Sequence, residues 1–127
     1  MRLKVHMTDY LYILGTILLT VYGQIVVKWQ VSVAGPFPAA PVEKAWFLAR
    51  LVFDPWVLSG FAAAFGASLC WMAAMTKFQL SYAYPFMSLS FALVLLSSAV
   101  LFRESITPAK VLGVALIAFG VFFASRG

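Results

Sequence analysis

The chain has 127 residues, of which 64% are hydrophobic and only 10% are charged, with a formal net charge of +5. A water-soluble domain of this length cannot bury so much apolar surface, so the composition excludes an ordinary soluble fold. One cysteine, Cys70, and one histidine, His6, exclude an internal disulfide and any zinc or haem spacing. We therefore expect no metal, no cofactor and no enzymatic activity.

Four apolar stretches, each about long enough for a helix to cross a bilayer, account for the composition. In chain order we expect helices over 9–33, 55–76, 82–103 and 108–125. The stretches lack the alternation of β-barrel strands. The sequence thus predicts an all-α polytopic membrane protein with four transmembrane helices and a single transmembrane domain over 1–127.

The first span carries its polar residues at a regular spacing. Thr16, Thr20, Gln24 and Lys28 recur every four residues, so they form one stripe that drifts slowly around a helix. An unpaired amide or ammonium in hydrocarbon is costly, so we expect this stripe to face protein, water or a polar substrate. The span is also longer than the apolar region of a signal peptide, and we expect it to be retained.

The connection over 34–54 contains three prolines that break a helix. Two alternatives stand for its second half. One is a short helix over 43–53 that lies in the membrane interface, with Glu43 and Arg50 on its polar side. The other is a loop whose aromatic residues lie at headgroup level.

The second span is rich in small residues over 60–68, which lets helices approach closely in lipid. Trp71, near its end, is a candidate for stacking on a sugar ring or, alternatively, for an interface anchor. In the third span Pro85 stands near the expected start, where proline is tolerated. Tyr84 and Ser88 are one turn apart and offer hydroxyls to a cavity, although membrane serines often bond back to their own helix.

Arg103 and Glu104 follow the third span, and we expect Glu104 to form an ion pair with a basic residue elsewhere, Lys28 among the candidates. The chain then restarts with Thr107 as the helix cap and Pro108 at the first helical position. Gly113 and Gly120 in the fourth span are two turns apart, and this notch favours a helix–helix contact.

Four spans place both termini and the connection with Lys77 on one side of the membrane. The basic residues are divided almost equally between the two sides, so they give little positive-inside bias. We expect the termini to be cytoplasmic; insertion in both directions is the alternative. Because the basic residues are spread over loops, we expect them to meet lipid headgroups, with no nucleic-acid partner.

Several motifs together resemble one family. They are Gly23-Gln24 with Lys28, residues 83–91 (AYPFMSLSF), residues 101–104 (LFRE), the Thr107–Pro108 restart, and the paired glycines. In this order they resemble the small four-helix members of the drug/metabolite transporter superfamily, which includes EamA-like and small-multidrug-resistance-like proteins. Within it the chain is most similar to the flippase subunits for aminoarabinose-phosphoundecaprenol. Multidrug-exporting relatives have a carboxylate in the middle of span one, where this chain has Thr20.

The resemblance implies a small-multidrug-resistance-like bundle in the bacterial inner membrane that flips a polyprenyl-phosphate-linked sugar. We expect Lys28 to hold the phosphate; the alternative is a lysine at the helix end whose ammonium only extends to the membrane interface. The other candidate substrate-binding residues are Gln24, Thr20, Tyr84, Ser88, Trp71, Arg103 and Glu104. We further expect a homodimer, or a heterodimer with a similar four-helix subunit, in contact through Gly113 and Gly120. The alternatives are a transporter of small metabolites or cations and an accessory membrane subunit that transports nothing.

Overall fold

The computed structural model of the chain describes residues 6–126. In chain order its elements are η1 (Met7–Asp9), α1 (Tyr10–Ala34), α2 (Pro41–Val52), α3 (Pro55–Met75), α4 (Leu80–Met87), α5 (Leu89–Leu101) and α6 (Pro108–Arg126). Four segments are long and apolar enough to cross a membrane: Met7–Ala34, Pro55–Met75, Leu80–Leu101 and Pro108–Arg126. The predicted all-α architecture with four transmembrane helices is confirmed.

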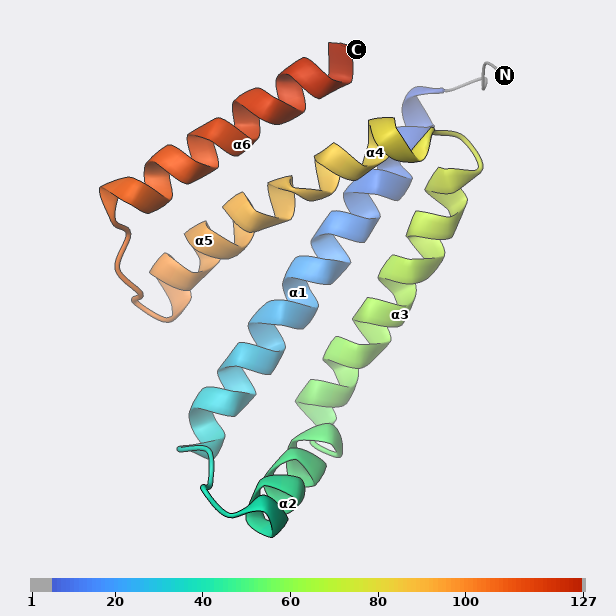
Figure 1. The fold of residues 1–127 in the computed structure, drawn as a ribbon. Helices are drawn as coiled ribbons and strands as arrows, with labels where there is room; N and C mark the ends of the chain where they lie inside the picture. The colour runs from blue at the N-terminus through green and yellow to red at the C-terminus, as the bar shows by residue number, and fades with distance from the viewer. Residues whose placement is uncertain (1–5, 127) are drawn as a thin grey trace.

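The helices form two pairs that meet at one end (Figure 1). α1 and α3 run side by side in opposite directions, and α2 links them at the far end. α4 and α5 start beside the N-terminal end of α1 and diverge from the α1–α3 pair, and α6 runs back along them on the outer side. The two pairs therefore converge near the start of α1 and open towards the α5–α6 turn.

Apolar side chains close the converging end. Ile13, Ile17 and Val21 on α1 pack with Phe78, which follows α3, and with two small residues, Ala74 and Ala83, that are fully buried. The ring of Tyr10 lies 4.9 Å from that of Phe78, and the Tyr10 and Tyr82 hydroxyls are 2.9 Å apart. This cluster joins α1, α3 and α4 at the end where the chain leaves α3.

Two glycines allow α1 and α3 to approach closely in their middle. A Cβ atom on Gly23 would lie 3.2 Å from the carbonyl oxygen of Gly60, and one on Gly60 would lie 3.5 Å from that of Gly23. Any larger side chain would separate the backbones, as is typical of small residues at membrane helix contacts. The small residues of the second span thus set the width of the α1–α3 pair.

The third span is divided at Ser88, which differs from the single helix expected over 82–103. The helix starts at Leu80, two residues before the expected start. Pro85 therefore lies in its interior, where proline lacks the N–H and clashes with the preceding turn. Next to it, the Ser88 and Phe91 N–H groups each donate three residues back, to Pro85 and Ser88. The tighter turn ends α4 and starts α5 in a new direction.

Side-chain caps define the starts of two spans. The Asp54 carboxylate accepts hydrogen bonds from the Trp56 and Val57 N–H groups at 2.8 and 3.3 Å, and Pro55 follows as the first residue of α3. The Thr107 hydroxyl accepts from the Lys110 N–H at 3.2 Å, which confirms the predicted restart of α6. Such caps satisfy backbone donors that the helix itself leaves free.

Most of α6 is exposed within this single chain. Its large apolar side chains lie mainly on the surface, including Leu112, Leu116, Phe119 and Phe123. A Cβ atom added at Gly113 or Gly120 would meet nothing within 4 Å. The glycine face therefore has no neighbour among residues 6–126.

Candidate functional site

A cavity of about 780 Å³ lies between α1, α3 and the α4–α5 junction. α1 contributes Thr16, Thr20, Gln24 and their neighbours Gly23 and Val27. The α3 wall runs from Gly60 to Met72, and the junction adds Tyr84 to Met87, Ser88, Ser90 and Phe91. α5 packs on α1 but makes no comparable contact with α3, so a space remains between these helices. None of its lining residues, all of which the structure describes, carries a charge.

Several polar side chains of the cavity wall already form hydrogen bonds with backbone carbonyls. The Ser88 and Ser90 hydroxyls donate to the carbonyls of Pro85 and Met87, and Ser68 donates to Ala64 at 3.1 Å. Thr16 donates to Tyr12 at 2.8 Å and also lies 3.4 Å from the Ala67 carbonyl. The hydrogen atoms of these hydroxyls are already donated in hydrogen bonds to backbone carbonyls. Towards a ligand the hydroxyl oxygens therefore act as hydrogen-bond acceptors.

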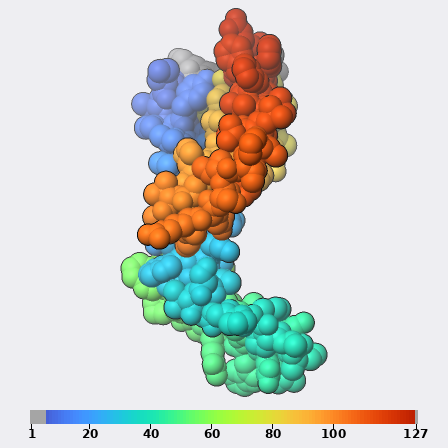
Figure 2. Space-filling view, turned by 90° about the vertical axis from the view of Figure 1, so that its left-hand side faces the viewer, coloured from blue at the N-terminus to red at the C-terminus, as the bar shows by residue number. Residues whose placement is uncertain are grey.

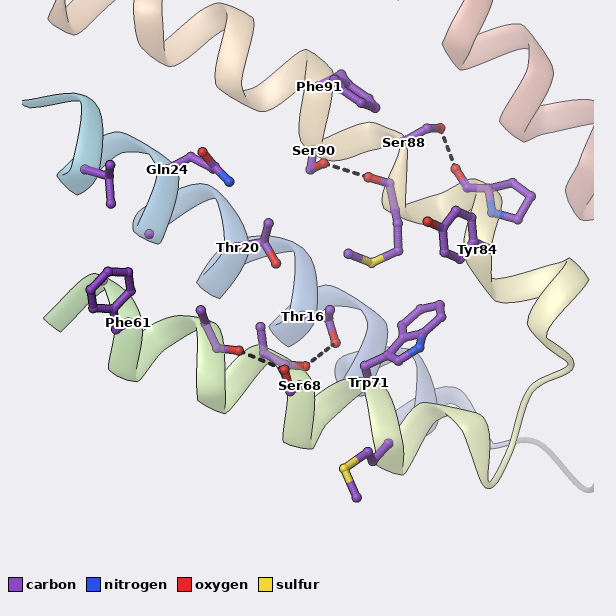
Figure 3. A pocket seen from close by; sticks show the side chains of 18 residues that line it. Thr16, Thr20, Gln24, Phe61, Ser68, Trp71, Tyr84, Ser88, Ser90 and Phe91 are labelled. Carbon is purple, nitrogen blue, oxygen red and sulfur yellow. Dashed lines mark hydrogen bonds between the residues drawn. The ribbon is translucent and has the colours of Figure 1, made fainter. Parts of the chain in front are cut away.

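The remaining polar groups of the cavity wall are available for hydrogen bonds with a ligand. Among the residues drawn in Figure 3, no hydrogen bond ends on Thr20, Gln24, Tyr84 or Trp71. The Gln24 amide offers donors and an acceptor, and the Thr20 hydroxyl offers one of each. Because Thr20 and Gln24 are one turn apart on α1, they present a short ladder of hydrogen-bonding groups to the same ligand.

Two aromatic residues close one end of the cavity. The ring of Trp71 on α3 lies edge-to-face with that of Tyr84 on α4, with centroids 5.9 Å apart. Figure 3 shows both side chains at the end of the cavity that is farther from Gln24. An aromatic wall opposite hydrogen-bonding groups is an arrangement suited to a ligand with one apolar and one polar face.

The other three predicted binding residues lie outside the cavity wall. Lys28 is one turn beyond Gln24, and its ammonium lies 3.8 Å from the Glu104 carboxylate. The expected ion pair of Glu104 is thus confirmed, with Lys28 as its partner. It connects α1 to the turn between α5 and α6, and in Figure 2 the orange atoms of this turn lie across the middle of α1.

The backbone conformation of Arg103 shapes this turn. Its φ angle of 54° is in the left-handed region, which residues other than glycine rarely adopt. This conformation brings the Glu104 N–H to the Ser98 carbonyl at 3.3 Å, after the Phe102 N–H has donated to the same oxygen at 3.0 Å. The end of α5 therefore fixes the backbone from which the Glu104 side chain extends.

Five of the eight predicted substrate-binding residues line the cavity: Thr20, Gln24, Trp71, Tyr84 and Ser88. The structure also places Thr16, Ser68, Phe61, Ser90 and Phe91 in the wall. Thr16 belongs to the same four-residue stripe, and Ser68 precedes Trp71 by three residues, so spacing contained a signal for both. The two phenylalanines stand in uniformly apolar spans, where no pattern distinguishes the cavity face.

Comparisons with known proteins agree with this architecture. The chain matches the EamA-like transporter family over residues 10–126. It is 38% identical over 113 residues to a probable 4-amino-4-deoxy-L-arabinose-phosphoundecaprenol flippase subunit ArnF of Aeromonas hydrophila, covering 87% of this chain and 75% of the relative. It is 33% identical over 127 residues to the protein of the same name in Photorhabdus laumondii, covering 94% and 98%. No solved structure matches the chain.

Proposed function

The chain belongs to the EamA-like transporter family, and on that premise we propose that it is a subunit of a flippase for an aminoarabinose-type sugar on undecaprenyl phosphate. The observation that carries this proposal is the cavity: its wall is uncharged, yet it offers free amide and hydroxyl groups and an aromatic end. A sugar has hydroxyls for the former and a C–H face for the latter. A cationic drug would find no carboxylate there.

The cavity is also open to the surroundings of the helix bundle. Phe61, Met72 and Phe91 line it and are between 48% and 65% exposed. In a membrane these apolar side chains contact lipid chains. This supports a binding mode in which the sugar enters the cavity while the polyprenyl chain stays in the bilayer.

We place the phosphate at Lys28. The neighbouring Trp29 packs edge-to-face on Trp56, with ring centroids 5.4 Å apart, and both rings are exposed. Tryptophan pairs of this kind are typical of the headgroup level of a bilayer. An ammonium at that level suits a lipid phosphate. The Gln24 amide and the Thr20, Tyr84 and Ser88 hydroxyls would then form hydrogen bonds with the sugar.

The exposed glycine face of α6 supports assembly with a second four-helix subunit. Gly113 and Gly120 leave a smooth notch with no neighbour in the described chain, and the flanking phenylalanines are exposed. We propose that this face forms the contact of a homodimer or heterodimer. The protein then lies in the bacterial inner membrane, and we place its termini on the cytoplasmic side.

A transport assay tests the function. The protein, with any partner that co-purifies, is reconstituted into liposomes that contain aminoarabinose-phosphoundecaprenol. A membrane-impermeant amine reagent then labels the lipid of the outer leaflet. Transport makes the inner-leaflet lipid reactive as well, so labelling proceeds beyond the level reached in protein-free liposomes. Labelling that stops at the protein-free level contradicts the proposal.

A pair of variants connects this activity to the cavity. Gln24→Leu removes the amide from the wall, and we expect the initial rate to fall about tenfold, the effect of roughly one lost hydrogen bond. Gln79→Leu makes the same chemical change at an exposed residue before α4 and should transport normally. Equal rates for the two variants would remove the cavity from the mechanism.

A further inference from the structure

We propose that Glu104 selects the substrate by its amine. It exchanges its ion pair with Lys28 for one with the sugar's ammonium group, while Lys28 binds the phosphate. This inference rests on the proposed function and adds what that function lacks, a group that distinguishes an amino sugar from a neutral one. Its starting point is the 3.8 Å separation of the Lys28 Nζ and Glu104 Oε1 atoms.

The ion pair is suited to exchange. Its two side chains are 54% and 43% exposed, and exposed pairs of this kind stabilise a fold only weakly. Its partners come from α1 and from the turn between α5 and α6, and few other contacts join these two segments. Opening the pair therefore costs the bundle little stability.

The position of the ion pair, next to cavity residues on α1, also fits this role. Val27 and Gln24 line the cavity, and Lys28 follows them directly on α1. Glu104 is fixed opposite by the left-handed Arg103 and by the hydrogen bond from its own N–H to Ser98. Before it enters the cavity, a sugar that lies across the entrance beside Gln24 thus meets one group of each charge, provided that the pair has opened to the width of the sugar.

The other carboxylates of the chain are committed elsewhere. The chain has four acidic residues in total, all within the described range. Asp9 accepts the His6 N–H at 2.8 Å and is buried, and Asp54 caps α3. Glu43 lies on α2, beside Trp46 and Arg50 in a separate surface hollow. Glu104 is the remaining carboxylate, and its partner Lys28 directly follows the cavity residue Val27.

The head group of the proposed substrate carries a counter-ion for each member of the ion pair. An amino sugar on a lipid phosphate carries an ammonium and a phosphate anion at opposite ends of the sugar. Such a head replaces one internal ion pair by two intermolecular ones. A lipid with an uncharged sugar takes Lys28 for its phosphate and leaves Glu104 without a counter-ion. Discrimination follows from this unpaired charge more than from any additional attraction.

A competition experiment measures the selectivity directly. The purified protein in detergent receives equal amounts of aminoarabinose-phosphoundecaprenol and its N-acetyl derivative, which keeps the phosphate but lacks the ammonium. Native mass spectrometry counts the bound lipids. We expect the wild type to favour the amine by about fivefold, the upper range for an exposed ion pair, and Glu104→Gln to bring the ratio near one.

Further variants separate recognition from structure. Glu104→Asp keeps the charge and should keep the preference. Lys28→Gln should weaken the binding of both lipids while the preference remains, because Glu104 is then free for the amine. Lys110→Gln is the matched control: Lys110 is a lysine of the same turn that donates to the Ser105 carbonyl at 3.0 Å, whereas Glu104 pairs with Lys28, so its loss should leave the preference between the two lipids unchanged.

Three results would overturn the inference. They are an equal affinity of the wild type for both lipids, a preference that persists in Glu104→Gln, and a loss of both lipids in Glu104→Gln with an unchanged ratio. Each leaves the flippase itself standing if the amine lipid still binds and is transported. Absence of binding for both lipids to the wild type would instead count against the proposed function.

Discussion

The contact between Gly23 and Gly60 allows a prediction with an internal control. The two glycines face each other, but a Cβ atom would meet different surroundings on each side. On Gly23 it would lie 3.2 Å from a backbone oxygen, whereas on Gly60 the nearest atoms would be 3.5 to 3.7 Å away. The first distance requires the helices to separate by a few tenths of an ångström, because a backbone carbonyl cannot rotate aside. The second is an ordinary contact.

Two opposing contributions set the change in the free energy of unfolding. Alanine is favoured over glycine inside a helix by up to about 1 kcal/mol. Inserting a methyl group into a tight contact typically costs about 1–3 kcal/mol. For Gly23→Ala both terms apply, so we expect the free energy of unfolding to fall by about 0–3 kcal/mol. For Gly60→Ala the helix term dominates, so we expect stability to be unchanged or to rise by up to about 1 kcal/mol.

The free energy of unfolding can be measured by following far-UV circular dichroism as a denaturing detergent is titrated into protein in mild detergent micelles. The difference between the two variants is the informative quantity, because both undergo the same chemical change at the same crossing. Gly60→Ala proving as destabilising as Gly23→Ala, or more so, would refute the packing described for α1 and α3.

Three further outcomes are expected. Thr107→Ala removes the cap of α6 and should lower the unfolding free energy by about 0.5–1 kcal/mol, while Asp54→Ala, which caps two N–H groups, should cost about 1–2 kcal/mol in the same titration; an order reversed between them would contradict the cap geometry. Trp71→Leu removes the aromatic contact with Tyr84 and should weaken binding of the sugar lipid about 2–10-fold by native mass spectrometry, and unchanged binding would remove Trp71 from the site. Gly120→Leu fills the notch on α6 and should shift the purified protein towards monomers in light scattering, because overpacking a tight contact costs about 1–3 kcal/mol, or roughly tenfold or more in dissociation constant, whereas an unaltered mass would exclude this face as the contact.

Hydropathy and length are enough to predict four spans, because a bilayer requires long apolar helices whatever their packing. The division of the third span was missed for a specific reason. The expected start at residue 82 placed Pro85 in the first turn, where proline is harmless, whereas the observed start at Leu80 places it in the interior. An error of two residues at a helix end thus concealed the interior proline and the division of the span beside it.

The polar stripe of α1 predicted Thr20 and Gln24 as cavity residues but extended one step too far. Each four-residue step turns by about 40° around the helix, so Lys28 points about 80° away from Thr20. By that point the stripe has left the cavity wall and reaches the α5–α6 turn instead. The contributions of Phe61 and Phe91 depend on how their helices are rotated, and a uniformly apolar span contains no pattern that determines rotation.

The uncharged wall of the cavity has an electrical consequence. A membrane potential acts on charge, with about 2.3 kcal/mol per elementary charge per 100 mV. Groups without charge, such as Thr20, Gln24 and Trp71, feel no such force as the helices around them rearrange. The voltage dependence of a transport cycle through this cavity is therefore set by the cargo, and a head group whose ammonium balances its phosphate crosses without moving net charge.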